Sequence, residues 1–126
     1  MSDIRRILVA DGDQSIRSLV SLTLSSDSCV VFEAANADQA LAQVAENVPQ
    51  VALVDQSLPG DGPDACRRIK RSPLGAGIRT VLLVPKSEVN EAGARNDPNV
   101  DALLTKPFTS LALLRKVDEM LEDVAS

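Results

Sequence analysis

Aromatic side chains are scarce in this sequence of 126 residues, which has two phenylalanines and neither tyrosine nor tryptophan. Proteins that hold single-stranded nucleic acid stack its bases on aromatic rings, so a base-stacking surface is not expected. Basic residues are also in deficit, because 13 lysines and arginines face 18 acidic residues and leave a formal charge of −5. Such a chain gains little from a phosphate backbone, and we expect no direct binding to nucleic acid.

Cysteines and long apolar runs are scarce as well. Cys29 and Cys66 are too few and too far apart for a disulfide framework or a zinc site, so we expect two small, buried free thiols in a reducing compartment. No apolar run approaches the roughly 20 residues that a membrane span needs, and no signal peptide is visible. We therefore expect a cytoplasmic protein that does not enter a membrane.

What the sequence does contain is a series of short apolar runs, at residues 7–10, 30–32, 51–54, 81–84 and 102–104. The runs are continuous rather than alternating, which is typical of strands buried on both faces in a parallel sheet.

Helical patterns separate these runs, although the pattern at residues 87–95 is weak. Residues suited to a first helical turn mark three of the expected helices: Asn36 or Asp38, then Pro63, then Thr109 or Ser110. Strand and helix alternate five times, so we predict a doubly wound α/β fold with right-handed crossovers. There is no linker or internal repeat, and we expect residues 1–126 to form a single domain.

Charged residues follow three of the apolar runs at the point where each predicted strand ends. Asp11 and Asp13 follow the first run, Asp55 the third and Lys106 the fifth. Functional groups collect beyond the carboxyl ends of parallel strands, so we expect two or three of these carboxylates and the lysine to meet at one rim. Crowded carboxylates repel one another, and Mg²⁺ relieves that repulsion. With a lysine to hold phosphoryl oxygens, the chemistry implied is formation and hydrolysis of an aspartyl phosphate.

Each of these residues also has a plainer interpretation. Asp13 could cap a helix that begins at Gln14. Taken singly, Asp11 and Asp55 could be structural, and Lys106 could be an ordinary surface lysine. Their joint occurrence at the ends of the first, third and fifth runs favours the functional interpretation.

Three segments carry a resemblance to a known family. Residues 7–13 (ILVADGD), residues 51–55 with the Leu58-Pro59 pair that follows, and residues 104–108 (LTKPF) resemble response regulator receiver domains of two-component signalling, the class that includes chemotaxis regulators. The resemblance covers essentially the whole chain. It implies a flavodoxin-like, three-layer α/β/α fold with five parallel strands in the order 2-1-3-4-5 and five helices.

The resemblance also implies roles for single residues. Asp55 would accept a phosphoryl group from a histidine kinase or phosphotransfer protein, and Lys106 would pair with that group. Mg²⁺ would be held by Asp11, Asp55 and the backbone carbonyl of Ser57. The Lys106–Pro107 peptide bond would be cis. Beyond self-phosphorylation and autodephosphorylation, no enzymatic activity is expected.

Three positions depart from the family pattern. Gly12 stands where most receivers have a second acidic residue, so either Asp13 takes its place as a metal ligand or Mg²⁺ binds more weakly. Pro85 stands where the family has a serine or threonine at the end of the fourth strand, and proline offers neither a hydroxyl nor a backbone N–H. Leu103 replaces the aromatic switch residue of the fifth strand.

These departures leave three functions open. The first is a receiver that is phosphorylated on Asp55 but has atypical switch residues. The second is a pseudo-receiver, a protein-interaction module that works without phosphorylation. The third is a haloacid-dehalogenase-like phosphatase that uses Asp11 and Asp13, although the chain has no acidic pair after the fourth run and no cap domain.

The output surface is expected on the fourth helix, fifth strand and fifth helix. It would contact a downstream partner or effector domain, or a second copy of the chain in a homodimer. The fourth helix region, residues 87–99, is polar, and we predict a short or mobile element there. A basic run at residues 67–71 is interpreted as a solvated face, with an acidic partner as the alternative.

Overall fold

Strands and helices alternate along the whole of the computed structural model, which describes residues 4–125 and the side chains up to residue 122. Residues 1–3 and 126, the ends of the predicted domain, lie outside the described residues. The strands are β1 (Arg5–Ala10), β2 (Cys29–Ala34), β3 (Val51–Asp55), β4 (Arg79–Pro85) and β5 (Ala102–Lys106). The α-helices are α1 (Gln14–Leu24), α2 (Ala37–Asn47), α3 (Gly62–Arg71), α4 (Val89–Arg95) and α5 (Ser110–Ala125), and a 3₁₀ turn, η1 (Lys86–Glu88), precedes α4.

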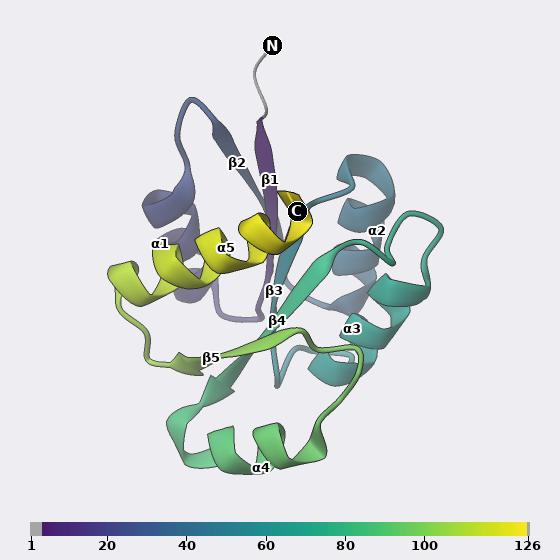
Figure 1. Ribbon diagram of the computed structural model, residues 1–126, viewed down its shortest axis with the longest axis vertical. Coiled ribbons are helices and arrows are strands. Elements are labelled where there is room, and N and C mark those ends of the chain that lie inside the picture. Colours follow the sequence, from purple (N-terminus) through teal and green to yellow (C-terminus); the bar gives the residue numbers. More distant parts are fainter. Residues whose placement is uncertain (1–3, 126) are drawn as a thin grey trace.

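The strands form one parallel sheet in the order β2-β1-β3-β4-β5, which confirms the predicted fold and strand order. In Figure 1, α1 and α5 lie on one side of the sheet, and α2 and α3 lie on the other. Residues of β1 alternate between the two cores, since Ile7 and Val9 pack with α1 and α5 while Leu8 and Ala10 pack with α2 and α3. Continuous apolar runs are therefore needed, because both faces of the central strands are covered.

The expectation of burial on both faces is wrong for β2. Val30 is 41% exposed, and Ala34 is the one residue of β2 that is fully buried. The physical reason is position, because β2 is an edge strand that pairs with β1 alone. An apolar run does not distinguish a central strand from an edge strand.

Helix starts follow the predicted capping residues. The Asn36 side chain accepts a hydrogen bond from the Gln39 amide at 2.9 Å, and Thr109 Oγ1 accepts one from Ala112 at 3.0 Å. Pro63 lies in the first turn of α3. The predicted weakness of the fourth helix agrees with an α4 of seven residues in which Ala92 alone is buried.

Both cysteines are free, as expected, but only Cys66 is fully buried. Burial raises the pKa of the Cys66 thiol to about 12, so it stays protonated at neutral pH. Across residues 4–125, no helix combines the length and the apolar character that crossing a membrane requires.

Candidate functional site

The candidate site lies at the edge of the sheet where β1, β3 and β5 end. Asp11 directly follows β1, Asp55 is the last residue of β3, and Lys106 is the last residue of β5. In the sheet, β1 has β2 on one side and β3 on the other, so the order of the strands reverses at β1. Open α/β sheets hold their functional groups at such a switch point.

The lysine of the cluster joins the two acids. Lys106 Nζ donates to Asp11 Oδ2 at 2.6 Å and to Asp55 Oδ1 at 3.2 Å. The side chain of Asp11 is 2% exposed and that of Asp55 is 13% exposed, so Asp55 is the carboxylate of this pair that solvent can reach. The structure thus brings together three of the predicted site residues, from positions up to 95 residues apart.

Lys106 is held in its charged form. Burial by itself lowers the pKa of Lys106, but the hydrogen bond to Asp11 and the charges of Asp55 and Asp11 outweigh it, so the pKa lies above the ordinary lysine value. Two carboxylates and one ammonium leave the cluster with a net negative charge. The Lys106–Pro107 peptide bond is cis, as the resemblance implied.

Asp11 is fixed by contacts that the sequence did not reveal. Its Oδ1 accepts a hydrogen bond from the Asp13 amide at 2.9 Å, and its backbone carbonyl accepts one from Arg17 Nη1 at 2.6 Å. Arg17 also pairs with Glu33 of β2 at 3.3 Å. No sequence motif identifies Arg17, because its contacts form only when the fold places the first turn of α1 beside β2.

Asp13 makes no side-chain contact with Lys106 among the described hydrogen bonds, and its expected role as a metal ligand stays a prediction. Its Oδ1 accepts a hydrogen bond from the Ser15 amide at 2.8 Å, which makes Asp13 the N-cap of α1. The cap satisfies a backbone N–H that has no partner inside the helix, and this was the plainer interpretation of Asp13.

The other predicted ligands are of the kind that a hard cation takes. Carboxylates of Asp11 and Asp55 and the carbonyl of Ser57, in the turn after β3, are the oxygen ligands that Mg²⁺ takes. Gly12 adds none, and a Cβ at that position would lie 3.2 Å from Pro59 Cδ. Among the described residues, no three acidic, histidine or cysteine side chains form a metal-binding group.

Of the other two atypical positions, Pro85 lies at this edge and Leu103 lies near the start of β5. Pro85 ends β4 and is paired in register with Lys106 of β5. Leu103 is partly buried against the core on the α2 and α3 side of the sheet.

Comparison with known proteins agrees with this geometry. Residues 7–118 match the response regulator receiver domain family. The chain is 30% identical over 118 residues to the phosphate regulon transcriptional regulatory protein PhoB of Pseudomonas aeruginosa, covering 93% of this chain and 52% of that protein. It is 31% identical over 117 residues to the response regulator MprA of a Mycobacterium species, covering 92% and 50%. The chain therefore spans about half the length of these two relatives.

Solved structures show the same fold. The receiver domain of NtrX from Brucella abortus superposes with a TM-score of 0.83 at 27% identity, covering 92% of this chain and 98% of that one. The chemotaxis response regulator CheY4 of Vibrio cholerae superposes with a TM-score of 0.81 at 22% identity, covering 93% and 98%, and shows the fold alone. On its sequence match, with the fold in agreement, this chain belongs to the response regulator receiver domain family of two-component systems.

Proposed function

We propose that this receiver domain accepts a phosphoryl group on Asp55 from a histidine kinase or a phosphotransfer protein. The observation that carries the proposal is the contact of Lys106 Nζ with both Asp11 and Asp55 at the switch point of the sheet. Asp55 is the more exposed of the two acids, so it is the acid that a donor can reach.

The transfer is a displacement at phosphorus. A carboxylate oxygen of Asp55 forms a bond to phosphorus, the nitrogen–phosphorus bond of a phosphohistidine breaks, and the imidazole leaves and takes up a proton. Water then attacks the acyl phosphate, which returns the carboxylate and releases inorganic phosphate. The domain modifies itself, and we propose no turnover of another substrate.

During this transfer, residues of the chain neutralise the negative charge of the phosphoryl group. The Lys106 ammonium neutralises the phosphoryl oxygens, and the buried Asp11 holds that ammonium in place. Asp11, Asp55 and the carbonyl of Ser57 would hold Mg²⁺, which supplies further charge neutralisation when bound. Because Gly12 has no side-chain oxygen and Asp13 caps α1, we expect weaker Mg²⁺ binding than two adjacent acids would give.

Treatment with phosphoramidate and Mg²⁺, followed by intact-mass measurement, tests the proposal. We expect one phosphoryl adduct on the wild type, none on Asp55→Asn and slower formation on Lys106→Met. Asp13→Asn is the matched control, since asparagine also caps helices and the variant should be modified as the wild type is. Equal modification of Asp55→Asn would refute Asp55 as the acceptor.

A pseudo-receiver is the second candidate, and Pro85 is the observation that favours it. Pro85, the last residue of β4, has no hydroxyl. A phosphoryl group on Asp55 would therefore lack the hydrogen bond that a serine or threonine at this position donates in the family. This candidate predicts no adduct on the wild type under conditions that modify an ordinary receiver, and full activity of Asp55→Asn in cells.

For output we propose the face formed by α4, β5 and α5, toward a downstream partner or in a homodimer. Leu111 is 56% exposed and Leu114 is 40% exposed on α5, which supports an apolar contact. Sedimentation of the wild type and of a Leu111→Ser, Leu114→Ser variant tests the homodimer. A monomeric wild type would exclude it and leave a different partner.

A further inference from the structure

The usual path from the phosphoacceptor to the output face is missing from this chain. Pro85 removes the hydroxyl at the end of β4, and Leu103 removes the aromatic ring on β5. If modification of Asp55 is to alter α4, another contact must join the two, and the described residues contain one.

That contact joins the residue after the phosphoacceptor to the segment that starts α4. Gln56 Nε2 donates a hydrogen bond of 2.8 Å to Glu88 Oε1, across 32 residues of sequence. The backbone of Gln56 is also fixed, because its N–H donates to the Leu83 carbonyl at 2.9 Å and its carbonyl accepts from the Gly62 amide at 3.3 Å. The position of the Gln56 amide is therefore tied to the backbone of Asp55.

The residues at both ends of this hydrogen bond each lack a further hydrogen bond. Glu88 is the N-cap residue of α4, yet its side chain makes no capping hydrogen bond, and its Oε1 accepts from Gln56 instead. Within residues 4–122, Gln56 Oε1 is buried and has no hydrogen-bond partner. A hydrogen-bond arrangement that leaves a buried polar atom without a partner is less stable, and so easier to rearrange, than one in which every polar atom is paired.

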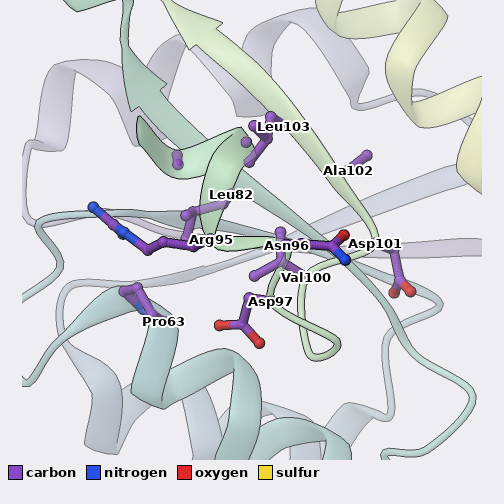
Figure 2. A pocket seen from close by; sticks show the side chains of 11 residues that line it. Pro63, Leu82, Arg95, Asn96, Asp97, Val100, Asp101, Ala102 and Leu103 are labelled. Atoms are coloured by element: carbon purple, nitrogen blue, oxygen red, sulfur yellow. The ribbon is translucent and has the colours of Figure 1, made fainter. Parts of the chain in front are cut away.

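The helix beyond Glu88 has room to move. Ala92 is the one buried residue of α4, and a pocket of about 200 Å³ lies between the C-terminal half of α4, the loop that follows it, β5 and the start of α3. Figure 2 shows Leu82, Val100 and Leu103 around this pocket, with Pro63 at the α3 side and Arg95 at the end of α4.

We infer that the Gln56–Glu88 hydrogen bond is the link through which modification of Asp55 reaches α4 in this chain. The inference rests on the proposed function. A phosphoryl group adds negative charge one residue from Gln56, which disfavours the Glu88 carboxylate nearby, and the backbone shift that accommodates it moves the Gln56 amide. Once released, Glu88 interacts with the positive end of the α4 dipole, and the start of the helix is rearranged.

The test uses the full chain with beryllofluoride and Mg²⁺ as a stable mimic of the phosphoryl group. Fluorine NMR reports whether the adduct forms on Asp55, and amide resonances of residues 86–95 report the response of α4. On the wild type we expect the adduct and shifted α4 resonances. On Gln56→Met and on Glu88→Ala we expect the adduct as before, with the α4 shifts lost.

Glu91→Ala is the matched control, since Glu91 is an acid of the same first turn that makes no contact with Gln56 among those described. It should respond as the wild type does. Unmodified Gln56→Met and Glu88→Ala should also show faster amide exchange in α4 than the wild type, with the exchange of β4 unchanged.

The outcomes separate the two proposals. A full α4 response in either Gln56→Met or Glu88→Ala, or unchanged α4 exchange in both, overturns the inference and leaves phosphorylation of Asp55 intact. No adduct on the wild type overturns the proposed function and, with it, the inference.

Discussion

At the residue scale, the backbone next to Asp55 limits the site as strictly as the charges do. Gly62 is buried at the start of α3, and a Cβ there would lie inside contact distance of the Asp55 carbonyl and 2.8 Å from the Gln56 carbonyl. Both carbonyls belong to the turn that carries the phosphoacceptor, so neither can move without moving the site.

Gly62→Ala is therefore expected to lower the free energy of unfolding by about 1–3 kcal/mol, the usual range for overpacking, and to shift the amide resonance of Asp55. Urea unfolding and NMR measure the two effects. Gly77→Ala is the control, because a Cβ at Gly77 meets no atom within 4 Å. If Gly62→Ala were as stable as Gly77→Ala, the close approach would not exist.

A second residue carries backbone strain far from the site. Val48 ends α2 in the left-handed region, with φ 42° and ψ 70°, a conformation that β-branched side chains rarely adopt. We expect Val48→Gly to be more stable than Val48→Ala by about 1 kcal/mol, since only alanine keeps the Cβ that opposes this conformation. Both variants lose the two γ-methyl groups of valine and differ only in the Cβ, so the comparison isolates the effect of the Cβ on this backbone conformation. Equal unfolding midpoints would contradict this account.

At the element scale, α3 and α4 differ in how firmly they are attached. Lys70 of α3 donates at 2.6 Å both to the Ile78 carbonyl and to Asp101, and Asp101 also accepts from the Thr80 amide at 2.8 Å. Burial alone raises the pKa of Asp101, but these partners outweigh it and hold the pKa below the ordinary value. Part of the basic run that was interpreted as a solvated face is thus used inside the molecule.

The weaker attachment of α4 leads to a prediction about Gly93. This residue lies inside the helix, and a Cβ there would be 4.0 Å from Leu103 Cδ1, an ordinary contact beside the pocket. Gly93→Ala should raise the free energy of unfolding by up to about 1 kcal/mol through helix propensity and slow amide exchange across α4. Ala94→Gly, at the neighbouring exposed position, should do the reverse. Faster exchange in Gly93→Ala would show that α4 is not limited by propensity.

At the scale of the whole molecule, the sequence predicted topology better than contacts. Apolar runs and helix caps were enough for the α/β class, because they report local burial and local hydrogen bonding, and the strand order came from the family resemblance. Convergence of Asp11, Asp55 and Lys106 followed from strand ends meeting at one edge. The capping role of Asp13 was left open, and the Gln56–Glu88 contact was missed, because side-chain partners depend on loop geometry that no spacing encodes.

Lys106 joins the ends of β1, β3 and β5, so its removal tests the stability of the whole sheet. Lys106→Met would leave the buried Asp11 without its cation, at a cost of about 1.5–3 kcal/mol for the lost charged hydrogen bonds. Lys116→Met is the control, since Lys116 pairs with Glu119 within one helix turn on the surface, where such pairs contribute little. Urea unfolding at neutral pH should show a large loss for the first variant and almost none for the second.

The pH dependence of that difference identifies its origin. Because the pKa of Lys106 is raised in the folded protein, the stability it contributes is fully present below the ordinary lysine pKa of 10.5 and is lost as the pH rises through the folded value. The gap in unfolding free energy between wild type and Lys106→Met should therefore stay constant from neutral pH to about pH 10 and narrow above it. A gap that persisted unchanged in strong alkali would show that packing of the lysine stem, rather than its charge, holds the three strand ends together.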